Sequence, residues 1–530
     1  MGLLTDPGME RSQLPALLEK YHRPICVILY VVGIVWFMAL AHNSLNHGTY
    51  FSENALLPGL VQGDFHGDSQ AVQYLESLTE EAEKHASGMP YPWLAAQFTQ
   101  LGLDTFTHNF TLHYPMGKDK IFTGKNVYGI LRASRGSSTE AVVAAINLEL
   151  HSSHVSHIDV KVEGLNGQLP NLDLVNLIHR LCQRENVHHT FKNRLQTLLA
   201  MVASQASGVP TGNHGLFHRY GIAAVTVEGQ QQQGRGWRSV SLHQLGRVLE
   251  GVCRSLNNLL ERFHQSFFFY LLPATNRYIS IGVYMPPFGM IAGGVLVKAL
   301  ALWYSTSCAA EEQHQNKNIK KKVDYGLLGC VPLVVLMHLV SVAVSCGPPM
   351  LSRCGLIMAL SAEDSVFLGT AAFCLTLLVL PSCINRYMGL QERSWEIVKI
   401  FAVLELGVLL FAGAVYNFSL ALIITIAFTP VALITSPSKS RMKWCLKSLL
   451  LILVHPLSML FLFVMLDTWQ NFSQLPINKL LWKSYIATKR ALMYSVVDSL
   501  IYSNWVFDVA TQCLLPVWLL FWQIVHYPTP

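Results

Sequence analysis

Charged side chains are scarce in this sequence. Asp, Glu, Lys and Arg make up 13% of its 530 residues, whereas soluble domains carry about 25%. Apolar residues account for 51%, and the mean hydropathy is +0.34. The net charge of +6 is modest, and Lys and Arg lie in short clusters beside apolar runs. This composition is typical of a membrane protein and argues against nucleic-acid binding.

Familiar catalytic motifs are also missing. The sequence has no HExxH, GxSxG, P-loop or CxxC pattern. Most of the eleven Cys lie in or beside apolar runs, and no Cys forms a convincing nucleophile pair with a His. Disulfides between Cys182 and Cys253 or between Cys346 and Cys354 stay open, because sequence alone does not fix pairing.

Long apolar runs dominate what is present. A spanning helix needs about 20 mainly apolar residues. Eight runs qualify: Pro24–Ala41, Ile279–Tyr304, Tyr325–Ser345, Val366–Cys383, Ile397–Tyr416, Ser419–Thr435, Leu446–Met465 and Trp505–His526. The fifth and sixth are nearly continuous, which favours a tight hairpin. Ala39-Leu40-Ala41 resembles a signal-peptidase site, but the region before it is long and carries Asp6 and Glu10, and the apolar run has the length of a helix, which favours an uncleaved anchor.

The runs divide the chain into five parts. We expect an N-terminal arm at 1–23, a first transmembrane helix at 24–41 and a polar α/β domain at 42–278. A seven-helix transmembrane bundle at 279–526 and a short tail at 527–530 complete the chain. The predicted fold is therefore an α-helical polytopic membrane protein of about eight spans with one α/β domain outside the membrane.

Basic clusters predict the orientation. Lys and Arg alternate between successive connections if the N-terminus and the tail are cytosolic and the polar domain is lumenal. The cytosolic clusters are Arg11, Lys20 and Arg23; Lys317 and Lys320–Lys322; Arg386, Arg393 and Lys399; and Lys439, Arg441, Lys443 and Lys447. The cluster Lys479–Arg490 breaks the pattern and suggests a loop on the membrane surface or on a partner. The lumenal sequons predict N-glycans at Asn109 and Asn471 but not at Asn417, which lies against the bilayer.

The polar domain alternates helical and strand patterns. Apolar spacing predicts helices at Ser69–His85, Trp93–Leu101, Asn171–Cys182, Leu195–Ser204 and Ser241–Gln265. Strands are predicted at Asp104–Tyr114, Lys125–Ala133, Ala141–Leu148, Ile158–Glu163 and Ala223–Glu228. The alternation favours an α/β sheet covered by helices.

Two groups of ionisable residues are candidates for chemistry. Glu149, His151, His154 and His157 are zinc-ligand types, but their spacing does not place all of them on one face, and exposed histidines are the favoured interpretation. His338, Glu405, His455 and Asp508 lie inside predicted spans, where interhelical hydrogen bonding is favoured over an ion pathway.

Four strings carry a family resemblance. They are TYFSENAL after the first span, GKNVYGILRA and VEGLNGQLPNLDLVNL in the polar domain, and LNNLLERFHQSFFFYLLP before the second span. They resemble the family of multi-spanning, GPI-handling subunits of glycosylphosphatidylinositol (GPI) transamidase. The resemblance implies a lumenal domain similar to M28 aminopeptidases but non-catalytic. It also implies that a segment of several dozen residues is missing after Val143, so the domain is expected to be incomplete.

The implied function is that of a non-catalytic subunit of the endoplasmic reticulum GPI transamidase. It would bind the GPI lipid and present it for attachment to the C-terminus of precursor proteins. The implied partners are a caspase-like catalytic subunit, other membrane subunits and the precursors. No cofactor is required, although Mg²⁺ or Ca²⁺ can bridge the GPI phosphate. The alternatives are a membrane-tethered M28-type metallo-aminopeptidase or metal-assisted amide-forming enzyme, and a lipid or solute transporter.

Candidate GPI-binding residues flank the first two spans. Tyr50 and Ser52 follow the first span closely, and His264, Gln265 and Ser266 precede the second. Short tethers hold both segments near the lumenal membrane surface, where their donors and acceptors suit phosphate and sugar hydroxyls. Gln265 is also the candidate ligand for Mg²⁺ or Ca²⁺. Pro516 of the last span is implicated by the resemblance alone.

Overall fold

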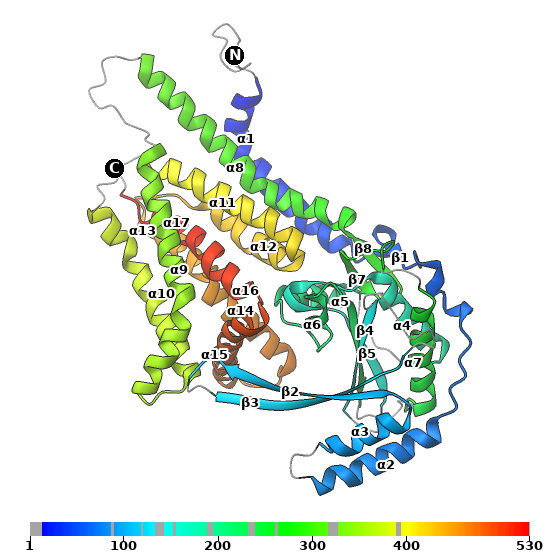
Figure 1. The fold of residues 1–530 in the computed structure, drawn as a ribbon. Coiled ribbons are helices and arrows are strands. Elements are labelled where there is room, and N and C mark those ends of the chain that lie inside the picture. Colours follow the sequence, from blue (N-terminus) through cyan, green and yellow to red (C-terminus); the bar gives the residue numbers. More distant parts are fainter. Residues whose placement is uncertain are drawn as a thin grey trace. The chain divides into compact units, whose positions relative to one another are not determined.

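The computed structural model describes residues 13–85, 89–117, 120–132, 143–151, 155–187, 194–231, 239–259, 263–315, 327–387 and 394–528. The chain forms two compact units (Figure 1). The helical unit contains Met1–Leu45, Gln205–Gly208 and Ile281–Pro530, and the sheet unit contains Asn46–Ser204 and Val209–Ser280.

The helical unit is built from apolar helices. They are α1 (Gln13–Ala39), α8 (Ile281–Gln315), α9 (Leu327–Ile357), α10 (Ala362–Tyr387), α11 (Trp395–Tyr416), α12 (Phe418–Ile434), α13 (Arg441–Leu453), α14 (Pro456–Asn471), α15 (Ile477–Tyr502), α16 (Val506–Asp508), the π-helical turn η5 (Val509–Leu514) and α17 (Leu515–Val525). The predicted polytopic membrane architecture is confirmed at this level. The first helix begins within the predicted N-terminal arm, at Gln13.

Six helical segments of the described chain are long and apolar enough to cross a membrane. They are Lys20–Ala39, Ile281–Ser307, Cys330–Ile357, Ala362–Tyr387, Trp395–Tyr416 and Val506–Val525. The predicted sixth span corresponds to α12, a shorter apolar helix of 17 residues. The tight hairpin is present, because only Asn417 separates α11 from α12.

The predicted seventh span is not one straight helix. It consists of α13 and α14, which are bent by 65° at a short break. Pro456 is the first residue of α14, and His455 caps that helix by accepting a hydrogen bond from the Leu457 amide. Proline has no amide hydrogen to continue the helix of the preceding turn, so the break falls at this position.

The connection that carries Lys479–Arg490 is a helix and not an irregular loop, and its place on the membrane surface or on a partner stays a prediction. These residues lie inside α15, a helix of 26 residues. Leu480, Ser484, Thr488 and Leu492 are all buried, and this four-residue spacing places them along one helix face. The Lys and Arg residues that suggested a loop occupy the other faces.

Close helix contacts depend on small residues. A Cβ on Gly33 of α1 would lie 2.8 Å from the Pro287 carbonyl of α8, so only glycine permits this approach. Seven residues earlier on α1, the Cys26 thiol donates to the Gly294 carbonyl at 3.2 Å. Between the two contacts, the residue number falls from 33 to 26 on α1 and rises from 287 to 294 on α8, so the two helices pack antiparallel.

The sheet unit holds three small sheets and several helices. Its strands are β1 (His47–Gly48), β2 (Asp104–Tyr114), β3 (Lys120–Ile130), β4 (Ala144–Leu150), β5 (His157–Lys161), β6 (Ala223–Gln230), β7 (Tyr270–Ala274) and β8 (Arg277–Ser280). Its helices are α2 (Asp68–Lys84), α3 (Tyr91–Gln100), α4 (Leu172–Arg184), α5 (Arg194–Ala206), α6 (Gly215–His218) and α7 (Leu242–Asn257). The last residues of α5 belong to the helical unit.

The strands do not form the one sheet that the sequence predicted. Their orders are β4-β6-β5, β2-β3 and β1-β8-β7. The β4–β6 pair is parallel, and all other pairs are antiparallel. Parallel pairing with helices in the crossover is the α/β feature that the alternating pattern predicted. The hairpin β2–β3 stands as a separate ribbon, because its long strands pair only with each other.

The helix predicted at Ser241–Gln265 is too long. Helix α7 ends at Asn257, and residues 263–269 are non-helical. This early end brings residues 264–266 into contact with other segments of the sheet unit.

Candidate functional site

Two segments predicted to bind the GPI headgroup meet at the start of α4. The backbone amides of Ser52 and Glu53 donate to Oδ2 of Asp173, at 3.0 and 2.8 Å. Asn171 caps α4 by accepting from the Asp173 amide. An acidic residue in the first turn also complements the helix dipole. The carboxylate of Asp173 therefore anchors the segment that follows the first span.

Glu53 anchors the second segment in the same way. Its Oε1 accepts from the backbone amides of His264 and Gln265, both at 3.2 Å. Burial raises the pKa of Asp173, and the hydrogen bonds from Glu53, Ser266 and Ser52 oppose that rise. Two buried carboxylates thus hold both predicted segments together.

The anchored backbone leaves several side chains facing outward. Tyr50 is 53% exposed, and the side chains of His264 and Gln265 are exposed as well. Ser52 and Ser266 are partly buried. Asn176 of α4 donates to the Tyr50 carbonyl at 3.1 Å. The result is a polar surface, here called the headgroup cluster, formed by Tyr50, Ser52, His264, Gln265 and Ser266.

Aromatic rings border the headgroup cluster. The ring of Tyr278 on β8 lies 6.3 Å from the ring of Tyr50 and 5.2 Å from that of Phe267. The pKa of Tyr278 rises to about 12, first because of its desolvation and then because of Tyr50. Tyr rings with an apolar body and a polar tip suit a boundary between membrane and water.

The structure adds supporting residues to the predicted cluster. Ser266 is partly buried beside Asp173, and its contact with GPI stays a prediction. Glu53 and Asp173 were missed by the sequence analysis, although both lie inside the strings TYFSENAL and VEGLNGQLPNLDLVNL. The carboxylate of Glu53, three residues after the candidate Tyr50, was the signal from which Glu53 could have been found. Pro516 is buried at the start of α17 in the helical unit, so it is not part of this cluster.

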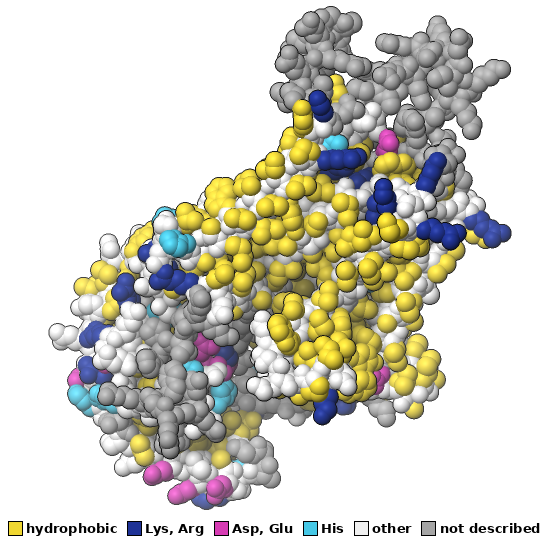
Figure 2. All heavy atoms as spheres, turned by 180° about the vertical axis from the view of Figure 1, so that it is seen from behind, with side chains coloured by type: hydrophobic (Ala, Val, Ile, Leu, Met, Phe, Trp, Pro, Cys, Tyr) yellow, Lys and Arg dark blue, Asp and Glu magenta, His cyan; other side chains and the backbone are white. Residues whose placement is uncertain are grey.

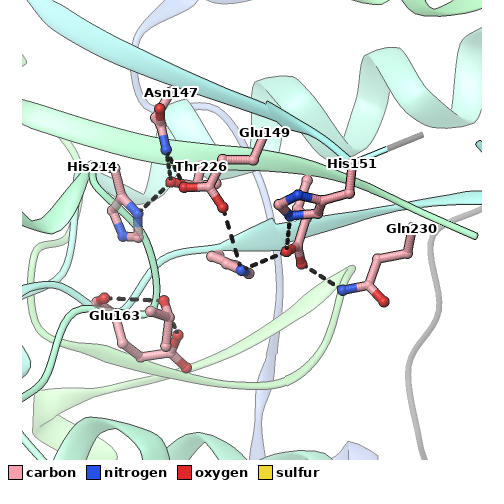
Figure 3. A network of polar contacts seen from close by, with 10 residues as sticks. Asn147, Glu149, His151, Glu163, His214, Thr226 and Gln230 are labelled. Carbon is pink, nitrogen blue, oxygen red and sulfur yellow. Dashed lines mark hydrogen bonds and ion pairs between the residues drawn. The ribbon is translucent and has the colours of Figure 1, made fainter. Parts of the chain in front are cut away.

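A second polar network lies in the β4-β6-β5 sheet (Figure 3). Glu149, His151 and Glu228 place their ligand atoms within 4.8 Å of one another. His151 Nε2 is 3.0 Å from Glu228 Oε1. His154 lies outside the described residues, and His157 contacts the Ser156 hydroxyl instead. Of the four candidate zinc ligands in the sequence, Glu149 and His151 are therefore brought together.

These residues fit a metal ion poorly, because a lysine takes the place of the cation. Lys161 Nζ lies 2.9 Å from Glu228 Oε1 and 3.7 Å from Glu149 Oε2. The remaining oxygens are also used: Asn147 donates to Glu149 at 2.7 Å, and Gln230 donates to Glu228 at 2.6 Å. A metal ion would have to displace the ammonium of Lys161 and would meet its repulsion.

His214 continues the network into the core. Its Nδ1 lies 2.8 Å from the Thr226 hydroxyl, which also accepts from Asn147 at 3.0 Å. Desolvation lowers the pKa of His214 to about 4, with a smaller contribution from His218. Burial raises the pKa of the neighbouring carboxyl of Glu163. The imidazole is therefore neutral at neutral pH and serves the packing of the sheet.

The thiols of the sheet unit are not activated. Burial raises the pKa of Cys182 to about 12 and raises that of Cys253 as well. The thiolate is the nucleophilic form, and it is depleted at both positions. Cys182 and Cys253 are free, as are Cys346 and Cys354.

Ionisable residues in the spans form interhelical contacts. His338 Nε2 of α9 lies 2.7 Å from Glu405 Oε1 of α11. Asp508 accepts from Ser499 of α15 at 2.7 Å and from Gln512 of η5 at 3.2 Å. The ring of His455 packs edge-on against Trp518. These contacts agree with the favoured interpretation of hydrogen bonding between helices.

The fold and the site define a polytopic membrane protein with a separate polar domain. A sequence model of the family described as Gaa1-like, GPI transamidase component matches residues 142–522, which is well over half of the chain. The chain therefore belongs to the Gaa1-like family of GPI transamidase components. The resemblance seen in the four strings is thereby confirmed.

Two curated relatives support the assignment. The GPI transamidase component gaa1 of Schizosaccharomyces pombe is 24% identical over 373 residues, and the match covers 52% of this chain and 63% of the relative. The GPI transamidase component GAA1 of Saccharomyces cerevisiae is 29% identical over 310 residues, covering 55% of this chain and 46% of the relative. The matches span less than two thirds of either relative.

Proposed function

We propose that this protein binds the GPI lipid and presents it for attachment to the C-terminus of precursor proteins. It does so as a non-catalytic subunit of GPI transamidase in the membrane of the endoplasmic reticulum. The observation that carries the proposal is the headgroup cluster. Two segments more than two hundred residues apart in the sequence meet there around Glu53 and Asp173.

The chemistry of the headgroup cluster fits a phosphorylated glycan. Gln265, His264 and Ser52 offer donors and acceptors for sugar hydroxyls and phosphate oxygens. The exposed ring of Tyr50 supplies an apolar face beside them. Mg²⁺ or Ca²⁺ is a further proposed element, with the Gln265 side-chain oxygen as one ligand. The apolar helices, including α17 with Pro516, would accommodate the lipid chains.

The catalytic step is proposed to belong to a caspase-like partner subunit. In the sheet unit, the thiols of Cys182, which is buried, and Cys253, which is exposed, both have a raised pKa, and His214 is neutral. The transporter alternative is weaker, because the acids of the spans serve contacts between helices. We also propose that the sheet unit is lumenal and that the N-terminus is cytosolic.

The experiment that tests the non-catalytic role uses protein purified in mild detergent. We expect a caspase-like subunit to co-purify and the separated chain to show no aminopeptidase or amide-forming turnover. The alternative function, a metalloenzyme, requires a metal ion bound at Glu149. Stoichiometric zinc together with turnover that is lost in Glu149→Gln would replace the present proposal with a metalloenzyme.

A further inference from the structure

Basic side chains from four different helices gather at one end of the helical unit. Lys298 of α8 interacts electrostatically with Arg23 of α1, and its Nζ lies 3.0 Å from His22 Nε2. Lys399 of α11 interacts electrostatically with Arg23, with Lys298 and with Lys447, which belongs to α13. Lys and Arg side chains are seen at this end in Figure 2. We call Arg23, Lys298, Lys399 and Lys447 the cation cluster.

The cation cluster has no protein counter-ion among the described residues. None of its four members forms an ion pair there, although twelve pairs occur elsewhere in that part of the chain. Among the described residues, the charged neighbours of Lys399 and Lys447 are all cations. The mutual repulsion is therefore not offset within the cluster.

Lys399 is the most deeply buried member of the cluster. It falls within the predicted fifth span, lies in α11 and is only 2% exposed. Its ammonium donates to the carbonyls of Leu433 and Thr435 at the end of α12. The C-terminal end of a helix favours such a donor, so these carbonyls hold the Lys399 side chain in place.

The other members are reachable from outside. Arg23 is exposed, and Lys298 and Lys447 are partly exposed. Lys447 donates to the carbonyl and the hydroxyl of Ser436, both at 2.8 Å, which keeps its ammonium beside the α12–α13 connection. A guanidinium and two ammonium groups thus remain able to contact an anion.

Apolar side chains beside these cations identify the kind of anion. Val27 of α1 is 58% exposed, Leu300 of α8 is 57% exposed and Leu446 of α13 is 56% exposed. Each lies within four residues of a member of the cation cluster along its own helix. A free phosphate ion gains no free energy from contact with apolar surface, whereas an acyl chain removes that surface from water.

We propose that the cation cluster binds the phosphate headgroup of an anionic glycerophospholipid whose chains lie against the neighbouring apolar helix surfaces. Basic sites between transmembrane helices are suited to such headgroups. The site is separate from the headgroup cluster and does not depend on the proposed function, because all of its residues belong to the helical unit.

The test measures binding of labelled phosphatidylserine to the full-length protein in phosphatidylcholine nanodiscs. Each basic residue near an anionic headgroup contributes about 1 kcal/mol, or about fivefold in affinity. The variant Arg23→Gln/Lys298→Gln/Lys447→Gln should therefore bind on the order of a hundredfold more weakly. The control Arg353→Gln/Lys479→Gln/Lys483→Gln removes the same charge at exposed positions outside the cluster and should bind normally.

Several results would overturn the proposal. Unchanged binding in the cluster variant, or an equal loss in the control, would show that no specific site exists. Equal competition by soluble inorganic phosphate would assign the cluster to a free anion. If the triple variant does not fold, the single exposed change Arg23→Gln decides the question: about a fivefold loss supports the site, and no loss refutes it.

Discussion

His214 gives the sheet unit a predictable response to acid. Its pKa is about 4 in the folded protein against about 6.5 when unfolded. The unfolded chain therefore binds the extra proton between these values, and the stability that the neutral ring contributes is lost as pH falls from 6.5 to 4. The loss amounts to about 3 kcal/mol at most. Hydrogen exchange of β6 in full-length protein, followed against pH, measures it.

The variant His214→Gln should flatten this part of the pH dependence, because it removes the titrating ring. The matched control is His66→Gln, whose side chain is 82% exposed and which should leave the profile unchanged. Buried acids such as Glu163 also titrate, but their effect is common to both proteins and cancels in the comparison. An identical slope in His214→Gln and wild type would refute the assignment.

N-glycosylation should separate two sequons that look alike in the sequence. Asn109 lies exposed on β2, where an oligosaccharide can attach. Asn417 is 1% exposed, donates to the Gln205 carbonyl at 2.8 Å and accepts from the Leu420 amide at 3.0 Å. A glycan there would break both bonds. We expect the endoglycosidase shift from Asn109 to vanish in Asn109→Gln and to persist in Asn417→Gln.

The remaining predicted site, Asn471, is exposed at the end of α14 and contacts Asp467, so it stays a predicted glycosylation site. A shift that survives Asn109→Gln but is abolished by Asn417→Gln would contradict the predicted lumenal assignment and the burial of Asn417 together.

At the candidate site, sequence reasoning found the outward-facing residues but not their supports. Tyr50, Gln265 and their neighbours were predicted from their distance to the spans and from the family strings. Glu53 and Asp173 were missed, because their hydrogen bonds join amides more than one hundred residues away. The nearness of Glu53 to Tyr50 was a local signal, but the sequence does not indicate which amides these carboxylates bind.

Among the elements, the last span contains a π-helical turn that follows Asp508 directly. The carboxylate of Asp508 joins Ser499 of α15 to Gln512 of η5, and the Ser345 hydroxyl of α9 lies 3.0 Å from Gln512. Pro516 cannot donate to the carbonyl of Gln512 one turn earlier, and the π-helical turn occurs at this point. The acid therefore connects three helices where the backbone ladder is irregular.

Replacing this acid should weaken the helical unit. Asp508→Ala leaves the donors of Ser499 and Gln512 without their acceptor, which costs about 1–3 kcal/mol. Thermal unfolding in mild detergent measures the change. Asp467→Ala serves as the control, because Asp467 is bonded only to the exposed amide of Asn471 at 3.3 Å. Equal stabilities of the two variants would show that Asp508 does not join the helices.

Element boundaries were predicted where the local pattern is strong. The strand Asp104–Tyr114 was predicted with the bounds that β2 has, because its polar and apolar residues alternate. The short strands β7 and β8 were missed, since their burial comes from packing and not from an alternating pattern. The charges of α15 concealed its buried four-residue repeat, and the 65° bend between α13 and α14 was not predicted.

For the whole molecule, the segment predicted to be missing after Val143 leads to a further prediction. Strand β4 begins at the next residue and is an edge strand of the β4-β6-β5 sheet among the described residues. Leu148 and Leu150 of β4 are 42% and 41% exposed. An unpaired, partly apolar edge is a weak point, so inserting the family's full segment should increase resistance to limited proteolysis.

The matched control for this comparison is an insertion of equal length in the 86–88 connection between α2 and α3, away from the β4 edge in sequence. It should leave proteolysis of the β4 region unchanged. Equal resistance of the native chain and the form carrying the family segment would show that the shorter sheet is already closed.

The measurement that tests the account most directly is retention of labelled GPI by the assembled complex. We expect Tyr50→Ala/Ser52→Ala/Gln265→Ala to assemble normally. The carboxylates of Glu53 and Asp173 accept hydrogen bonds from backbone amides, which these substitutions leave in place. Each lost polar contact costs about 0.5–3 kcal/mol, so GPI retention should fall at least about tenfold. The control Gln73→Ala/Tyr74→Ala/Ser77→Ala on exposed α2 should retain GPI. Normal GPI retention by a correctly assembled cluster variant would contradict the assignment of the headgroup cluster.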